Sequence, residues 1–244
     1  FTFAVLISCM SKQIKFAVLG YGHIGKKHTA MVAGNDDSTI VAVAEPDDAR
    51  RKDAEEAGYT VYKNEDELFA GEGKIDVVCV CTPNGLHASQ ALKALEAKCH
   101  VVVEKPMGLN RVQCEEIIYK SLQVSKHVFC VKQNRYSPSS EWLKSLMVEE
   151  RLGKIAMVNL RCFWNRDERY YKKNHWKGTK DMDGGVLFTQ FSHFIDIMYW
   201  LMGDITNIQS RFTNFNHQHN TEFIDSGVVN FEFVNGGMGA LSFS

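Results

Sequence analysis

A charged pair directly follows a run of β-branched residues in the stretch His100-Val101-Val102-Val103-Glu104-Lys105-Pro106. The valine run is typical of a strand buried on both faces of a parallel sheet. Open α/β sheets bind ligands at the carboxyl ends of such strands, and Pro106 restricts the backbone after Lys105. We therefore expect a carboxylate and an ammonium group to face a ligand here. A solvated Glu–Lys pair in a surface turn is the alternative.

A glycine motif near the start of the chain has the spacing of a dinucleotide-binding turn. Gly20, Gly22 and Gly25 lie between an apolar strand at 14–19 and a helical stretch, and Glu45 stands 20 residues after Gly25. The glycines allow a tight turn, close approach of the backbone to a pyrophosphate, and helix-on-strand packing. The N–H groups at the start of the helix bind phosphate. Glu45 is expected to accept hydrogen bonds from the ribose and to repel a 2′-phosphate, which favours NAD over NADP.

Two other stretches bear on the same ligand. Arg50 and Arg51 could pair with a 2′-phosphate, so NADP stays the less favoured alternative to NAD. Their simpler role is to form the solvated face of a helix. Thr82-Pro83-Asn84 ends another buried strand at the same edge of the sheet. Asn84 is expected to cap the following helix and could also contact nicotinamide or substrate. His87 lies in the first turn of that helix.

The helix predicted over residues 186–202 is apolar nearly all round, with one narrow polar stripe. Thr189, Ser192, His193 and Asp196 form the stripe at helical spacing. Because a buried polar stripe must be paired or face a ligand, His193 is a candidate for proton transfer. Asp196 could orient its imidazole or cap a neighbouring backbone. A structural histidine on a buried helix is the alternative.

An aromatic and basic segment precedes that helix. It comprises Trp164-Asn165-Arg166, Tyr170-Tyr171 and His175-Trp176-Lys177-Gly178. Such a segment could stack a base or a sugar and pair with phosphates, or it could be an ordinary surface loop. His217-Gln218-His219 has metal-like character, but no third ligand is evident, so we interpret it as a loop and predict no metal site.

The elements that must position these residues alternate in the first half of the chain. Strands are predicted at 14–19, 40–44, 75–81, 100–103 and 127–131, and helices at 47–57, 86–97 and 111–122. This order predicts an α/β fold with an N-terminal Rossmann domain, a doubly wound parallel sheet over residues 10–132. After a helix at 140–150, strands at 155–164, 205–215, 223–233 and 238–243 predict a mainly antiparallel sheet in a second α/β domain, residues 133–244. The last strand runs into the C-terminus, so we expect this domain to be incomplete.

Composition argues against several classes of protein. Of 244 residues, 45% are hydrophobic and 23% are charged, and the net charge is -1, so no strong field favours nucleic acid or an anionic membrane. Seven cysteines without a C-x-x-C pair predict a reduced, cytoplasmic protein. Residues 1–9 are apolar, lack a basic residue and precede Met10. We interpret them as an upstream or non-native leader rather than a signal peptide.

Several of these motifs together resemble the Gfo/Idh/MocA family of NAD(P)-dependent sugar and cyclitol oxidoreductases. They are Gly20–Gly25, Thr82-Pro83-Asn84, His87, Glu104-Lys105-Pro106 and Asp183-Gly184-Gly185-(x7)-His193-x-x-Asp196. The resemblance implies a Rossmann domain followed by an α/β domain whose open-faced sheet forms oligomer contacts, and a bent, often cis, peptide before Pro106. It also implies that Lys105 and His193 lie at the sugar hydroxyl being oxidised, beside the nicotinamide.

One position departs from the family pattern. Thr189 stands where the family commonly has Asp or Asn, and a hydroxyl cannot act as a general base at neutral pH. His193 or Lys105 must then take the proton. Within the family, the aromatic and basic segment followed by Asp183-Gly184-Gly185 is similar to the subgroup that oxidises nucleotide sugars. Its best-known activity is the UDP-N-acetylglucosaminuronate 3-dehydrogenase step of polysaccharide biosynthesis. An inositol or free-sugar dehydrogenase and a non-catalytic NAD-binding regulator are the alternatives.

These interpretations give one set of candidate site residues. The candidate catalytic residues are Lys105 and His193. The candidate cofactor contacts are Gly20, Gly22, His23, Ile24, Gly25, Glu45, Thr82, Pro83, Asn84, His87, Glu104, in a supporting role, and Lys105. The candidate substrate contacts are Lys105, Gln133, Asn134, Arg135, Trp164, Arg166, Tyr171, Trp176, Thr189 and His193. We expect a sugar or nucleotide sugar as substrate, no nucleic acid or membrane partner, and a homo-oligomer, dimer or tetramer, formed through the open sheet.

Overall fold

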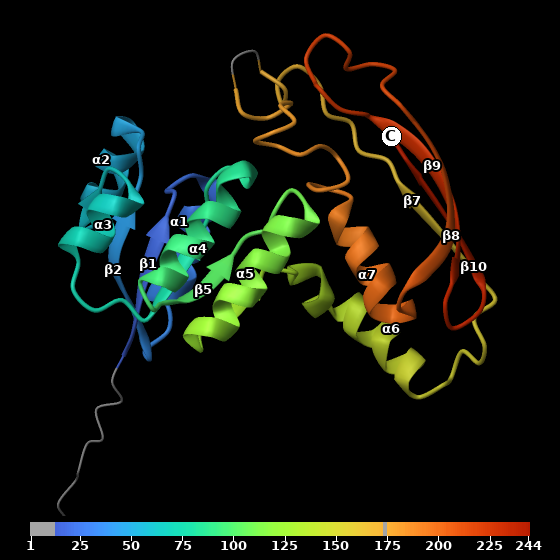
Figure 1. Ribbon diagram of the computed structural model, residues 1–244, viewed down its shortest axis with the longest axis horizontal. Helices are drawn as coiled ribbons and strands as arrows, with labels where there is room; N and C mark the ends of the chain where they lie inside the picture. The colour runs from blue at the N-terminus through green and yellow to red at the C-terminus, as the bar shows by residue number, and fades with distance from the viewer. Residues whose placement is uncertain (1–12, 173–174) are drawn as a thin grey trace, which may run out of the picture. The chain divides into compact units, whose positions relative to one another are not determined.

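The chain divides into two compact units (Figure 1). This computed structural model describes residues 13–172 and 175–244, so the expected leader at 1–9 lies outside the described residues. The first unit comprises the chain up to Thr82, Ser89–Val103 and Glu115–Phe129. The second comprises Pro83–Ala88, Glu104–Cys114 and Cys130–Ser244. Among the described residues, no helix has the length and apolar character needed to cross a membrane.

The first unit is built on a six-stranded sheet of order β3-β2-β1-β4-β5-β6, in which the pairings from β3 through β5 are parallel. The strands are β1 (Ile14–Leu19), β2 (Ser38–Ala44), β3 (Val61–Tyr62), β4 (Val77–Val80), β5 (His100–Val103) and β6 (Val128–Cys130). The helices between them are α1 (His23–Ala33), α2 (Asp48–Glu56), α3 (Glu65–Gly71), α4 (His87–Glu96) and α5 (Arg111–Val124). The predicted doubly wound sheet is confirmed.

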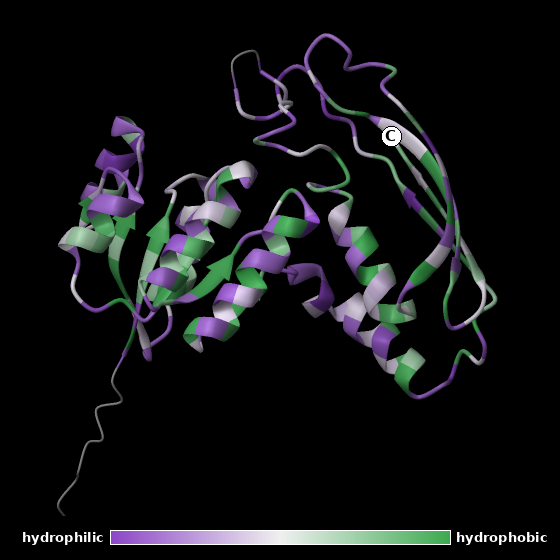
Figure 2. Ribbon diagram, in the orientation of Figure 1, coloured by the Kyte–Doolittle hydropathy of each residue, from purple (hydrophilic) through white to green (hydrophobic). Residues whose placement is uncertain are grey.

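The central strands are apolar because they are covered on both faces. Val18, Val43 and Val78 are fully buried, as are Val101 and Val103 of β5. Figure 2 shows these strands as hydrophobic and the surrounding helices as mixed. The valine run before Glu104 is therefore a buried parallel strand, as its composition predicts.

The second unit places two helices beside a four-stranded sheet of order β7-β10-β9-β8. Its elements are a 3₁₀ turn η1 (Asn84–Leu86), a second 3₁₀ turn η2 (Gln133–Tyr136), α6 (Pro138–Val148), β7 (Met157–Cys162), α7 (Ser192–Met202), β8 (Ile205–Thr213), β9 (Ser226–Phe233) and β10 (Met238–Phe243). β9 pairs antiparallel with both β8 and β10, whereas β10 pairs parallel with β7. Phe191 and Met198 pack against Phe231 and Phe243 to form the core between α7 and the sheet. The mainly antiparallel sheet is confirmed, with one parallel pairing.

The helix predicted over 186–202 is wrong in its first part. Residues 186–191 form turns, and α7 begins at Ser192. The chain enters this region through Gly184 and Gly185, whose φ angles of 82° and 104° lie in the left-handed region. These angles cannot belong to a right-handed helix, and the Phe191 N–H reaches back to the Val186 carbonyl at 3.0 Å in a wide turn. Thr189 therefore lies in the turn before α7, not on one helical stripe with His193.

Candidate functional site

The glycine turn in the first unit joins β1 to α1. Gly20 has a φ of 87°, and a Cβ there would lie 2.9 Å from the Cys81 carbonyl oxygen. A Cβ on Gly25 would collide with the Gly20 carbonyl, so α1 packs closely on the turn. Gly22 differs, because a Cβ there would meet nothing within 4 Å, and no side chain caps α1. An open space lies in front of Gly22 at the start of a helix, as a phosphate cradle requires.

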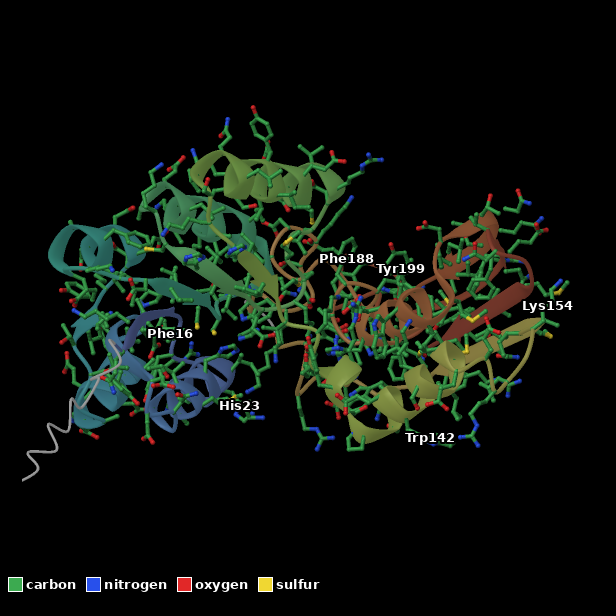
Figure 3. The ribbon with its side chains drawn as sticks, turned by 90° about the horizontal axis from the view of Figure 1, so that it is seen from below. Phe16, His23, Trp142, Lys154, Phe188 and Tyr199 are labelled. Carbon is green, nitrogen blue, oxygen red and sulfur yellow. The ribbon has the colours of Figure 1, made fainter. Side chains whose placement is uncertain are left out.

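Glu45 ties the end of β2 to this turn. Its carboxylate is 3% exposed and accepts the N–H groups of Tyr21 at 2.7 Å and Asp47 at 3.0 Å. The Arg50 guanidinium lies 3.9 Å from the same carboxylate, and the Arg51 guanidinium donates to the Glu45 carbonyl at 2.9 Å. Both arginines therefore already contact groups of the β2–α2 turn. His23 and Ile24, at the first residues of α1, are exposed, and Figure 3 labels His23.

The residues after β4 make hydrogen bonds to other parts of the protein. Thr82 donates its hydroxyl hydrogen to the Gln90 side chain at 2.5 Å. Asn84 is the first residue of η1, and its buried side-chain amide donates to the Asp183 carbonyl oxygen at 2.8 Å. The His87 ring, 1% exposed, lies with Nδ1 2.7 Å from the Pro106 carbonyl oxygen. It thus fastens the turn after β5.

Lys105 is half-buried and His193 is buried, both in the second unit. The Lys105–Pro106 peptide bond is cis, as the family resemblance implies, and the Lys105 Nζ donates to the Thr189 carbonyl at 3.5 Å. Burial lowers the pKa of Lys105, against the charge of the adjacent Glu104. Burial, followed by the positive charges of Lys105 and Lys132, lowers the pKa of His193 to about 4. His193 is therefore neutral at neutral pH, and its Nδ1 has no hydrogen-bond partner among the described residues.

Thr189 links Lys105 to Arg166. The Thr189 carbonyl accepts from Lys105, and its hydroxyl accepts from the Arg166 Nη1 at 3.0 Å while donating to the Gly185 carbonyl at 3.2 Å. The Arg166 guanidinium also lies 4.2 Å from the centre of the Tyr170 ring, a cation–π contact. Lys105, Thr189 and Arg166 are thus connected by hydrogen bonds in the second unit.

Two residues absent from the sequence-based set belong beside this group. Asp183 is 1% exposed; its Oδ2 accepts the Gly178 N–H at 2.9 Å, and its Oδ1 has no partner among the described residues. Burial raises the pKa of Asp183, against the Gly178 hydrogen bond and the charge of Arg166. The Lys177 Nζ lies 4.0 Å from the centre of the Tyr170 ring. The signal for Asp183 was its place directly before the Gly-Gly pair, and Lys177 stood within the aromatic and basic segment.

Asp196 does not orient His193, which corrects the sequence-based expectation. Its two carboxylate oxygens accept from Arg135 Nε and Nη2, each at 2.7 Å, and Lys132 lies 3.8 Å away. A bidentate pair of this kind fixes both side chains. Arg135, a candidate substrate contact, therefore joins η2 to α7. Its neighbours Gln133 and Asn134 are exposed.

The aromatic candidates differ in exposure. Trp164 is 56% exposed, Trp176 is half-buried, and Tyr171 is buried against Tyr170 and Phe223. Within residues 13–172 and 175–244, no three His, Cys, Asp or Glu side chains gather in a group that could hold a metal ion.

The comparison with family models covers most of the chain. Residues 14–132 match the oxidoreductase family with an NAD-binding Rossmann fold, Gfo/Idh/MocA, and residues 141–244 match the C-terminal domain of the same family. The matched residues include the glycine turn, Lys105 and His193.

Solved structures agree with this assignment. The WlbA dehydrogenase from Chromobacterium violaceum, in complex with NADH and UDP-GlcNAcA, is 32% identical with a TM-score of 0.89, and the match covers 96% of this chain and 67% of that one. The WlbA dehydrogenase from Bordetella pertussis, in complex with the same two ligands, is 29% identical with a TM-score of 0.90, and the match covers 94% and 70%.

One curated relative is named for inositol rather than for a nucleotide sugar. The myo-inositol 2-dehydrogenase of Thermotoga maritima is 23% identical over 235 residues, which is 93% of this chain and 67% of the relative. Three other curated relatives, two of them uncharacterised oxidoreductases and one a 2,7-anhydro-N-acetylneuraminate hydratase, are matched over only 50% to 60% of their length. The two family models together span both units, and the chain therefore belongs to the Gfo/Idh/MocA family of NAD-binding oxidoreductases.

Proposed function

We propose that this protein is an NAD-dependent dehydrogenase that oxidises a secondary hydroxyl of a nucleotide sugar, of the UDP-N-acetylhexosamine or uronate type. The observation that carries the proposal is the half-buried Lys105 together with the buried His193, both with lowered pKa values; Thr189 joins Lys105 to Arg166. The two WlbA dehydrogenases, whose structures hold NADH and UDP-GlcNAcA, support the choice of substrate class.

The glycine turn fits the cofactor. The open space before Gly22 and the uncapped start of α1 would hold the pyrophosphate, and the Glu45 carboxylate would repel a 2′-phosphate. When bound, NAD⁺ accepts a hydride from the carbon that bears the substrate hydroxyl. Glu104, next to Lys105, supports the ammonium group through its negative charge.

The hydroxyl proton must pass to a base as the carbonyl forms. His193 is neutral and can accept it, and Lys105 can accept it because burial favours its uncharged form. The Thr189 hydroxyl cannot serve as a base at neutral pH; it accepts a hydrogen bond from Arg166 instead. We assign Lys105 and His193 as the catalytic residues.

We assign recognition of the substrate's negative charge to Arg166. Its guanidinium stands in the second unit with the aromatic ring of Tyr170 on one face, and Lys177 approaches the same ring. Trp164 and Trp176 offer flat surfaces for a base or a sugar. Gln133 and Asn134, exposed on η2, are further proposed contacts.

Turnover assays test the proposal. The full-length protein is mixed with NAD⁺ and either UDP-sugars or inositols, and NADH formation is followed. UDP-GlcNAcA should be oxidised, and Lys105→Ala and His193→Ala should each abolish or strongly slow the reaction. Intact turnover in both variants would show that the site is misplaced.

An inositol or free-sugar dehydrogenase is the second candidate, supported by the inositol-named relative. Oxidation of inositols but not of UDP-sugars would establish it. Cofactor binding without hydride transfer across the whole panel would instead indicate a regulator.

We also propose that the open face of the second sheet forms a homo-oligomer. Along β9, Val228, Asn230 and Glu232 are exposed while Phe231 and Phe233 are buried, so one face of the sheet packs on the core and the other does not. Met157 and Met238 are exposed on the neighbouring strands and pair with each other in register. Val228→Glu should convert a dimer or tetramer to a smaller species in light-scattering measurements of mass. An unchanged mass would show that the contact lies elsewhere.

A further inference from the structure

The loop between β8 and β9 holds a histidine whose two ring nitrogens are both engaged. His217 Nδ1 lies 3.0 Å from an oxygen of Asp225, and Nε2 lies 2.6 Å from the backbone carbonyl oxygen of Arg166. The ring is packed edge-on against Tyr171, with centroids 5.4 Å apart. The sequence motif around His217 is therefore a built contact between two segments rather than a bare loop.

The chemistry of the two partners determines what the ring must do. A carboxylate and a backbone carbonyl are both acceptors, and a neutral imidazole carries only one N–H. Each ring nitrogen of His217 lies within hydrogen-bond distance of one of these acceptors, so the ring bridges Asp225 and the Arg166 backbone.

Asp225 anchors the His217 ring and the loop around it. Burial opposes its ionisation, but hydrogen bonds from the Phe215 and Asn216 N–H groups, from His217 and from Ser226 lower the pKa of Asp225 to about 2. The carboxylate is thus negative under all ordinary conditions. Its bonds to the two N–H groups, at 3.0 and 2.8 Å, also fix the loop that carries His217.

The loop at 214–225 is hydrogen-bonded through His217 to the segment that carries Arg166. The Arg166 carbonyl is held by His217, and its guanidinium reaches Thr189 at 3.0 Å and Tyr170 at 4.2 Å. A backbone shift at this residue would move the guanidinium away from Thr189. His217 therefore controls where the positive charge of Arg166 stands.

We propose that His217, anchored by Asp225, is a positioning residue that sets the Arg166 guanidinium for an anionic group of the substrate. This inference rests on the proposed function in assigning Arg166 to substrate recognition. The groups that face the ring are Asp225 on its own loop, and the Arg166 backbone carbonyl and Tyr171 on the segment after β7.

The first experiment measures KM and kcat for UDP-GlcNAcA in the wild type, His217→Gln and Asp225→Asn. We expect His217→Gln to raise KM roughly tenfold, as loss of a charge-assisted hydrogen bond allows, with a smaller change in kcat. Asp225→Asn should raise KM in the same direction, because the ring loses its anionic partner. His219→Ala is the matched control, because the His219 side chain is 63% exposed and its ion pair is with the exposed Glu168. It should behave as the wild type.

The second experiment measures KM for UDP-GlcNAcA in Arg166→Ala. We expect this variant to raise KM at least as much as His217→Gln. A KM in His217→Gln equal to the wild type, while Arg166→Ala raises KM, would overturn the inference and leave the proposed role of Arg166 standing. If Arg166→Ala itself leaves KM unchanged, the assigned role of Arg166 fails, and the positioning role fails with it.

Discussion

At the scale of single residues, Lys105 and His193 are the two groups that can take the proton of the substrate hydroxyl. Oxidation releases a proton, so the base must be unprotonated and kcat should rise with pH through its pKa. His193 has a pKa of about 4, whereas the pKa of Lys105 is lowered from 10.5. Because a base works best when its pKa lies near the working pH, we expect Lys105 to dominate. The rise in kcat should then lie below pH 10.5 and well above pH 4.

The measurement is kcat for the oxidation across the pH range, in the wild type and in Lys105→Met. Lys105→Met should lose the rise together with most of the activity. A rise centred near pH 4 and a flat profile above it would instead make His193 the base.

Thr189 gives a second prediction at this scale. Thr189→Val removes the hydroxyl that accepts from Arg166 and leaves the half-buried guanidinium without that partner. Loss of such a bond costs about 1–3 kcal/mol, so KM for the anionic substrate should rise roughly tenfold or more. Thr189→Ser keeps the hydroxyl and should stay close to the wild-type KM. Equal KM values in Thr189→Val and the wild type would show that this bond does not position Arg166.

At the scale of elements, the valine runs and the glycine spacing were enough to predict the parallel sheet and the dinucleotide turn. Burial on both faces and positive φ angles impose those residue types directly. The start of α7 could not be predicted, because the apolar pattern continues through residues 186–191 while the left-handed Gly184-Gly185 pair redirects the chain. The partner of Asp196 was also hidden, since Arg135 lies 61 residues earlier in the sequence.

The glycine pair makes a prediction about stability. Gly185 has a φ of 104°, and a Cβ there would lie 3.1 Å from the Phe223 ring. Gly185→Ala should therefore lower the free energy of unfolding by about 1–3 kcal/mol, measured by urea denaturation. Gly73→Ala is the control, because a Cβ at Gly73 meets nothing within 4 Å and its φ is not in the left-handed region. Equal unfolding free energies for Gly185→Ala and Gly73→Ala would contradict the argument.

At the scale of the whole molecule, the two predicted tasks fall in different units. The glycine turn and Glu45 belong to the first unit, whereas Lys105, Thr189, Arg166 and His193 belong to the second. The sequence motifs alone could assign residues to both tasks, because each motif is local. The links within the second unit, Thr189 to Arg166 and His217 to Arg166, join segments that no local pattern relates. Variants in the first unit should therefore alter the choice of cofactor without altering the pH dependence of proton transfer.

Glu45→Gln tests this separation. The amide can still accept the Tyr21 N–H, at present 2.7 Å from the carboxylate, but no longer repels a 2′-phosphate. We expect the ratio of kcat/KM with NAD to kcat/KM with NADP to fall roughly tenfold, a change that one lost charge–charge repulsion near a protein surface can supply. The rise of kcat with pH at saturating NAD should be the same as in the wild type, because Lys105 and His193 are unchanged. A shifted pH profile would show that the tasks are coupled. An unchanged cofactor ratio would mean that Glu45 serves only to hold the glycine turn through Tyr21 and Asp47.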